Sequence, residues 1–183
     1  MSDSLPMHFD ATIVKQLQNQ DPKTVKEWYF FTFPSLLRQA AKFYSQHNDQ
    51  LTAVHNAQLK ALTNIDKFSP GSSMEAWLAT ILRNELIDTY RRKQRWRFRP
   101  FTALEEPVLE ENFDLQIDHE FENQKVAQLL DLLAEKTRFV FSLFVFEELK
   151  PREIAALLSM NVQTVHWHLK TAKATLKKHL NHD

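Results

Sequence analysis

The amino-acid sequence predicts an all-α protein of two small helical domains joined by an acidic linker. Apolar residues recur at three- and four-residue spacing over most of the chain, strand-like alternation is scarce, and the 183 residues include a single glycine. Charge is segregated. Residues 1–99 carry 14 basic and 9 acidic groups, residues 100–124 carry 8 acidic and no basic groups, and residues 125–183 carry 9 basic and 6 acidic groups. This pattern is typical of two basic modules with an acidic connector, although the formal net charge is zero.

Composition also excludes several classes of site. The chain has no cysteine, which rules out disulfides, thiolate zinc sites and cysteine nucleophiles. His166 and His168 point to different helix faces and no carboxylate pair or nucleophile accompanies them, so we expect no enzyme, no metal and no cofactor. No apolar run reaches transmembrane length, and the N-terminal MSDSLPMHFD lacks the apolar core of a signal peptide. We therefore expect a cytoplasmic protein.

The N-terminal part of the chain predicts three helices. Residues 11–46 suggest two of them, with a break at Asp21-Pro22, and residues 50–68 form a third amphipathic segment. The aromatic run Trp28–Phe33 is expected in the core, and part of it could serve as a partner surface. Ser72–Glu75 has the S-x-x-E spacing of a capping box, which predicts a new helix over residues 73–96.

This capped helix has one apolar and one polar side. Its apolar side carries Leu78, Leu82, Leu86 and Tyr90, and its polar side carries Thr80, Arg83, Asn84, Asp88, Arg91 and Arg95. The helix ends in RRKQRWRFR, which interleaves cations with Trp96 and Phe98. Arginine holds phosphates and aromatic rings stack on unpaired bases, so the segment suits single-stranded nucleic acid. The alternative is a basic helix end that favours the macrodipole and stays solvated.

An acidic linker is expected over residues 98–124, because this stretch contains Pro100 and Pro107 and has no convincing apolar face. We expect it to be at least partly unfolded, with its charge serving either solubility or contact with a basic channel. A domain over residues 1–97 would precede it, and a second over residues 125–183 would follow. In the second domain, helical periodicity resumes at 125–134, and FVFSLFVF at Phe139–Phe146 is expected to be a buried helix.

The C-terminal segment predicts a helix, a tight turn and a second helix. Pro151 suits the first turn of a helix, and Asn161 is a good N-cap for a helix that starts at Val162. In that second helix Val165, Leu169, Ala172 and Leu176 share one face, whereas Gln163, Trp167 and Lys170 point the opposite way. Such a helix can read the major groove of duplex DNA, and the alternative is an ordinary helical hairpin with a solvated face.

The order of these motifs resembles the extracytoplasmic-function (ECF) group of the sigma-70 family of bacterial sigma factors. The resemblance covers region two at about 11–97 and region four at about 125–180. The matching residues are Trp77-Leu78, Arg83-Asn84, Asp88 and Arg91-Arg92 in region two, and Glu153-Ile154-Ala155 and Thr164-Val165 in region four.

The resemblance implies that the chain binds core RNA polymerase and promoter DNA, and it admits an anti-sigma factor as a further partner. Region four would read the minus-thirty-five duplex, through Gln163, Thr164, His166, Trp167, Lys170 and Lys173. Region two would capture the opened minus-ten strand, through Lys67, Phe68, Ser69, Ser72, Arg83, Asn84, Arg91, Arg92 and Arg95. The polymerase-binding residues would include Asp49, Leu51, His55 and Leu59.

Three features depart from the family pattern. The helix that usually binds polymerase lacks most of its acidic residues, which puts the strength of polymerase contact in question. Ser159 occupies the place of the usual glycine in the region-four turn, and His166 and His168 replace basic residues. We therefore expect phosphate affinity that is weak and pH-sensitive near neutrality. The competing interpretations are a helix-turn-helix regulator that binds duplex DNA without polymerase, and a degenerate sigma-like interaction protein.

Overall fold

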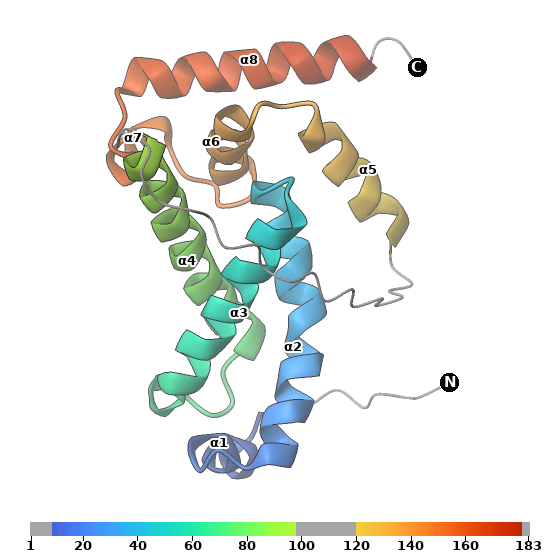
Figure 1. Ribbon diagram of the computed structural model, residues 1–183, viewed down its shortest axis with the longest axis vertical. Helices are drawn as coiled ribbons and strands as arrows, with labels where there is room; N and C mark the ends of the chain where they lie inside the picture. Colours follow the sequence, from blue (N-terminus) through green and yellow to red (C-terminus); the bar gives the residue numbers. More distant parts are fainter. Residues whose placement is uncertain (1–8, 98–119, 181–183) are drawn as a thin grey trace.

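The structure is a computed structural model that describes residues 9–97 and 120–180. These residues form helices and no strand (Figure 1). In order, the elements are α1 (Ala11–Gln18), α2 (Pro22–Phe43), α3 (His47–Thr63), the short 3-10 helix η1 (Ile65–Lys67), α4 (Met74–Arg97), α5 (Glu120–Asp131), α6 (Glu135–Val145), α7 (Pro151–Leu158) and α8 (Val162–Leu180). Helices α2, α3 and α4 run along the length of the molecule, with α1 across one end and α8 across the other (Figure 1).

Local signals place most helix starts where the sequence predicts them. Asp21 caps α2 by accepting a hydrogen bond from the backbone N–H of Thr24 at 2.9 Å, and Pro22 occupies the first turn, which confirms the break between α1 and α2. The predicted cap of α4 is wrong by one residue. Ser73, and not Ser72, accepts from the N–H of Ala76 at 3.1 Å. The Ser72 hydroxyl donates instead to the carbonyl of Ser69 at 2.7 Å, within the preceding turn.

The aromatic run in α2 is divided between core and surface. Trp28 and Phe33 are buried, whereas Phe30 and Phe31 remain 48% and 37% exposed. Trp28 and Phe33 belong to the main buried cluster, and the ring of Phe33 stacks on that of His55 in α3, with centroids 5.7 Å apart. The expectation of a core is therefore confirmed for half of the run.

One continuous core joins the N-terminal helices to the C-terminal ones. Residues of α2, α4, α6, α7 and α8 belong to the same buried cluster, in which Phe43, Tyr90 and Phe139 meet. The sequence predicts both modules but not this packing between them. The helix predicted at Phe139–Phe146 is confirmed by α6, but it is buried only in part, because Phe144 and Val145 are each 43% exposed. Helix α5 begins at Glu120, inside the stretch expected to be linker. Residues 98–119 lie outside the described part of the chain.

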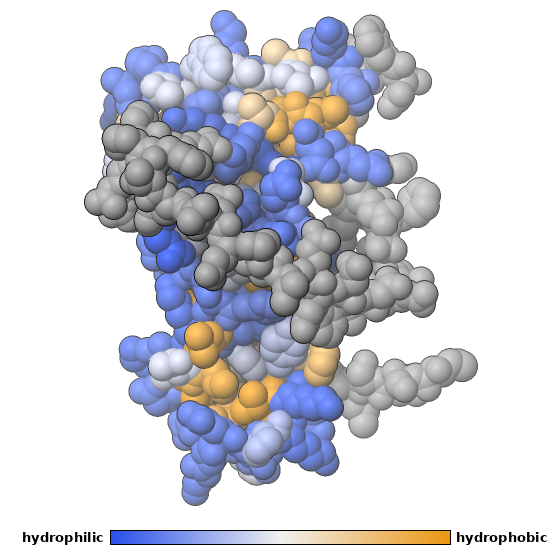
Figure 2. Space-filling model, in the orientation of Figure 1, coloured by the Kyte–Doolittle hydropathy of each residue, from blue (hydrophilic) through white to orange (hydrophobic). Residues whose placement is uncertain are grey.

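A smaller apolar cluster holds α8 to α5 and α6. Leu130, Leu133 and Ala172 are buried there, with Phe141, Phe146 and Leu176 packed against them. Figure 2 shows apolar surface below α8, near the turn that connects α5 to α6. None of the described helices is both long and apolar enough to cross a membrane.

Candidate nucleic-acid interface

Helices α7 and α8 form the predicted helix-turn-helix, and the turn is set by two residues. Ser159 ends α7 in the left-handed conformation, with φ of 52°, where a glycine would have no steric cost. Asn161 then caps α8 through a hydrogen bond that its side-chain oxygen accepts from the N–H of Gln163 at 2.8 Å. The predicted Asn161 cap and the Pro151 start are both confirmed.

The outer face of α8 is polar and exposed, and its inner face is buried. Val165 and Ala172 are fully buried, while Trp167 is 59% exposed on the opposite side. The residues predicted to contact duplex DNA are all exposed, and they are Gln163, Thr164, His166, Trp167, Lys170 and Lys173. A helix fixed by its back and presenting amide, aromatic and ammonium groups can enter a major groove.

His168 does not belong to this face, and the expectation that it contributes to phosphate affinity is wrong. Its side chain is 5% exposed, and its Nδ1 lies 2.9 Å from the Thr137 hydroxyl of α6. Burial lowers the pKa of His168, with a smaller contribution in the same direction from the nearby charge of Lys136. His168 therefore fastens α8 to α6, and His166 is left as the exposed histidine of the pair.

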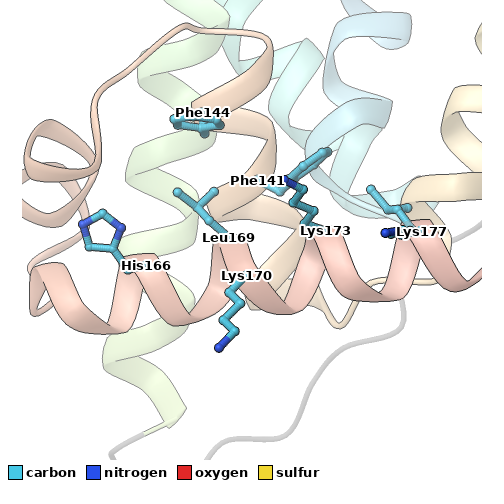
Figure 3. A pocket seen from close by; sticks show the side chains of 8 residues that line it. Phe141, Phe144, His166, Leu169, Lys170, Lys173 and Lys177 are labelled. Carbon is cyan, nitrogen blue, oxygen red and sulfur yellow. The ribbon is translucent and has the colours of Figure 1, made fainter.

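A cavity of about 650 Å³ lies beside the outer face of α8, between α8 and α6. Apolar side chains such as Phe141 and Leu169 line it together with His166, Lys173 and Lys177 (Figure 3). Lys170 also borders the cavity, but Figure 3 shows its side chain directed away from Phe144. Basic groups that line this cavity add positive charge beside the face of α8 that is expected to contact DNA.

The predicted residues lie along the polar side of α4, but some of them already have partners within the protein. Asn84 and Asp88 are exposed. Arg83 lies 3.6 Å from a carboxylate oxygen of Glu147, in the loop after α6. Arg91 donates from Nε to the backbone carbonyl of Leu157 at 2.7 Å, and its Nη1 lies 4.0 Å from Asp88. The side chain of Arg95 lies outside the described part of the structure.

Arg92 faces a different side of α4 from the rest of the predicted strand-binding residues. Its Nη2 donates to Glu85 at 3.2 Å and to the hydroxyl of Thr89 at 2.9 Å. Glu85 is 2% exposed and also pairs with Lys60 of α3. This buried charge cluster is not among the features that the sequence predicts. Its signal is the spacing of Glu85, which falls three residues after Leu82 on the apolar side of the helix.

The segment from Lys67, the last residue of η1, to the start of α4 presents hydroxyl and ammonium groups but not its aromatic ring. Lys67, Ser69 and Ser72 are exposed. Phe68 is 3% exposed and packs against Trp77, with ring centroids 5.3 Å apart, so its ring is not available to a base in this arrangement. Gly71 adopts φ of 84°, which a glycine tolerates without strain, and donates to the carbonyl of Phe9 at 3.4 Å.

The predicted polymerase-binding residues of α3 divide into two kinds. Asp49 pairs with Lys93 of α4, and Leu51 is partly buried against the core. His55 contacts the hydroxyl of Tyr29 at 3.1 Å, and Leu59 is 65% exposed. Leu59 therefore offers apolar area to a partner, whereas Asp49 and Leu51 already serve the fold.

Comparison with known proteins assigns the two modules. The family model for sigma-70 region 2 matches residues 33–97, and the model for sigma-70, region 4 matches residues 123–176. The ECF RNA polymerase sigma factor EcfG of Rhodopseudomonas palustris is 52% identical over 42 residues, which are 23% of this chain and 23% of that protein. The RNA polymerase sigma factor YlaC of Bacillus subtilis is 28% identical over 125 residues, covering 67% of this chain and 72% of that protein.

Two solved structures are similar in part. One is the structure of CnrH in complex with the cytosolic domain of CnrY, with a TM-score of 0.45 and 22% identity over 95% of this chain and 98% of that chain. The other is the sigma factor RpoE in complex with the anti-sigma factor NepR from Bartonella quintana, with a TM-score of 0.46 and 24% identity over 88% of this chain and 99% of that chain. On the two family models and the sequence relatives, this chain belongs to the sigma-70 family of RNA polymerase sigma factors, in its extracytoplasmic-function group.

Proposed function

We propose that this protein binds core RNA polymerase in the cytoplasm, directs it to a set of promoters and assists strand opening. The outer face of α8 reads the minus-thirty-five duplex. The polar side of α4 and the loop at 67–73 hold the minus-ten strand as it opens. Core polymerase and promoter DNA are the partners, and an anti-sigma factor is a further predicted partner.

The proposal rests above all on the division of α8 into a buried and an exposed face. Gln163 can offer both a donor and an acceptor to a base edge, while Lys170 can neutralise a phosphate. Trp167, at 59% exposure, is a large apolar group that the fold leaves in solvent. An exposed tryptophan between an amide and an ammonium group, with the ring of His168 edge-on to it at 4.9 Å between centroids, supports a binding face more than a solvated hairpin.

Strand capture follows from charge and shape on α4. Asn84 is exposed at the centre of the polar side and carries both donor and acceptor groups. Arg83 and Arg91 flank it and suit phosphates. Removing bases from the stack costs about a few kcal/mol per step, which phosphate contacts and base contacts together must offset. Because Phe68 is buried, the strand is held chiefly by polar and charged groups on this surface.

Polymerase binding is supported by exposed apolar area on α2 and α3. Leu59 and Phe30 are 65% and 48% exposed. Large apolar side chains that remain in solvent are typical of interfaces with a partner. The few acidic residues of α3 leave apolar contact as the main contribution that this helix can make.

Transcription in vitro with purified core polymerase tests the proposal. We expect the protein to co-elute with core enzyme and to start transcripts from a subset of duplex promoters. Permanganate should then detect unpaired thymines in the minus-ten region. If the protein shifts duplex DNA but neither co-elutes with core enzyme nor melts a promoter, it is a duplex-binding regulator instead.

A further inference from the structure

A row of basic side chains runs along one flank of α8. His166, Lys170, Lys173 and Lys177 follow one another at intervals of four, three and four residues. Such intervals bring side chains to the same side of an α-helix, and eleven residues span about 16 Å. All four residues line the cavity between α8 and α6. One wall of the cavity is therefore basic along its whole length.

The other wall of the cavity is apolar. Phe141 and Phe144 of α6 contribute to it, and Leu169 and Leu176 of α8 continue it onto the recognition helix. Phe144 is 43% exposed, so the fold leaves a large aromatic side chain in contact with water beside the basic row. A ligand that covered this wall would gain free energy by removing apolar surface from water.

The basic row has no acidic counterpart in the protein. Within residues 9–97 and 120–180, no ion pair includes Lys170, Lys173 or Lys177. No acidic residue is among the described residues that line the cavity. An anionic group of a ligand would therefore meet positive charge that no carboxylate of this part of the chain already neutralises.

The combination of walls defines the chemistry of a ligand. A nucleic-acid backbone would use the ammonium groups but leave the phenylalanines in water, and a purely apolar molecule would leave the cations unpaired. The cavity holds about 650 Å³, within the range of about 300–1,000 Å³ for sites that enclose small molecules. Two turns of helix, about 10–12 Å wide and about 11 Å long, occupy on the order of 1,000 Å³. The cavity thus fits a small anionic amphiphile better than a helical peptide.

We propose that this cavity binds a free long-chain fatty carboxylate. Its acyl chain lies along Phe141 and Phe144, and its carboxylate lies between Lys173 and Lys177. These lysines are four residues apart on α8, so their Cβ atoms are about 5–6 Å apart and both ammonium groups can donate to one carboxylate. Figure 3 shows His166 at the opposite end of the cavity, where a single imidazole offers less positive charge.

Occupation of the cavity has a consequence for promoter binding, and this consequence rests on the proposed function. Lys173 is predicted to contact duplex DNA, and a carboxylate bound to it neutralises its charge. Saturation with ligand should therefore weaken duplex binding by about three- to tenfold and reduce the salt slope by about one. Binding of the fatty carboxylate itself does not depend on a role of Lys173 in DNA binding.

Isothermal titration calorimetry of the full-length protein with myristate, below its micelle concentration, tests the site. We expect one myristate per protein molecule. Tetradecyltrimethylammonium is the matched control ligand, because its chain has the same number of carbons and its head group has the opposite charge. We expect it to bind at least about tenfold more weakly than myristate, since it would place a cation beside the basic row.

Substitutions at both walls locate the bound molecule. Phe144→Ser should weaken myristate binding by about tenfold, because apolar contact with the acyl chain is lost. Lys177→Gln, outside the residues predicted to contact DNA, should weaken it by about three- to fivefold, because one exposed cation is removed. Lys178→Gln is the control, since Lys178 is exposed but does not line the cavity, and it should bind as the parent does. If circular dichroism shows that Phe144→Ser does not fold, Phe144→Leu should give a smaller loss.

The outcomes separate this site from its alternatives. Absence of myristate binding, or equal affinity in the parent and both wall variants, would overturn the proposal. Association of the protein with phosphatidylglycerol vesicles in flotation, without binding of free myristate, would assign the cavity to a lipid surface instead. Unchanged duplex affinity at saturating myristate would overturn the link to promoter binding. Failure of the protein to initiate with core polymerase would refute the proposed function and leave the calorimetric result intact.

Discussion

Arg91 of α4 donates a hydrogen bond to the backbone carbonyl of Leu157 in α7, at 2.7 Å across 66 residues of sequence. The bond links a residue of the region-two signature to the helix-turn-helix. Because the carbonyl belongs to the last turn of α7, the arginine also satisfies an acceptor that lacks a partner within its own helix. We therefore expect a substitution of Arg91 to alter the packing of the two modules as well as the proposed strand binding, which determines how its variants are interpreted.

Base reading by α8 is tested with two substitutions on the same face. Gln163→Ala should relax preference at one position of the upstream element by about 1–3 kcal/mol, because a base contact is lost. Lys170→Ala should weaken all sequences alike and reduce the salt slope by about one, if it holds a phosphate. Fluorescence anisotropy with a panel of singly substituted duplexes distinguishes the two. Lys178→Ala, near the end of α8, is the control. Unchanged affinities of both variants across the panel would contradict the assignment of Gln163 and Lys170 to the DNA-binding face.

Strand opening is predicted to need the polar side of α4. Arg91→Ala with Arg95→Ala should abolish open-complex formation on duplex promoters, and a promoter with a mismatched bubble should restore part of it. Asn84→Ala provides a cleaner test, because Asn84 is exposed and the substitution leaves the Arg91–Leu157 bond in place. We expect reduced permanganate reactivity in this variant with normal binding to core polymerase. Normal melting by both variants would show that this side of α4 is merely solvated.

Polymerase affinity should depend on Leu59. Truncation of an exposed leucine that becomes buried at an interface removes about 1–3 kcal/mol of apolar contact. Leu59→Ala should therefore weaken co-elution with core enzyme while thermal unfolding of the protein alone stays the same. Leu132→Ala is a matched control in the turn after α5, where the leucine is 39% exposed. Equal loss in both variants would mean that Leu59 has no special role.

The buried Glu85 should make stability depend on acid. Burial alone raises its pKa, but the hydrogen bond and charge of Lys60, with Asn56 and Arg92, outweigh burial and bring the pKa below its ordinary 4.5. Glu85 thus contributes stability above about pH 4.5, and this contribution is lost as the pH falls through the lower folded value. Glu85→Gln should lower the free energy of unfolding by about 1–3 kcal/mol at pH 7. Urea titrations at pH 7 and pH 4 should show a smaller difference at the lower pH, and exposed Glu27→Gln should change neither.

His168 should act in a higher pH range. Its pKa is lowered in the folded protein, so below about 6.5 the unfolded chain binds a proton that the folded chain does not. The contribution of neutral His168 to the free energy of unfolding is fully present above that value. It is lost as the pH is lowered through the folded pKa, by at most about 1.4 kcal/mol per pH unit. His168→Gln should flatten this slope between pH 7 and pH 5 in urea titrations. An unchanged slope would show that another group, such as His55, whose pKa burial also lowers, accounts for it.

The sequence predicts local structure well because its signals are local. Pro151 and Asn161 mark helix starts by their own chemistry, and the spacing of Val165 and Ala172 identifies the buried face of α8 without reference to any other segment. The same is true of the break at Asp21-Pro22. These features can be predicted without knowing which segments they pack against.

The remaining features depend on partners far away in sequence. Arg138 precedes an apolar run, and its residue type predicts solvent exposure. In the structure it is buried because it donates to the carbonyls at the end of α2. The family resemblance places Phe68 in the strand-binding loop and His168 among the residues that set phosphate affinity, but neighbouring elements bury both. Helical periodicity tells which face is covered, not which segment covers it.

The capping of α2 by α6 has a consequence for synthesis on the ribosome. Arg138 Nε lies 96 residues beyond the Lys42 carbonyl that it caps. At about 5–20 residues per second, translation delivers it roughly 5–20 s after α2 has been made. During that interval the nascent N-terminal helices must fold with the end of α2 hydrated. Tyr90 has no stacking partner until Phe139 has been synthesised. During synthesis the sigma factor is thus a one-module protein with an uncovered α4, before the C-terminal helices pack against it.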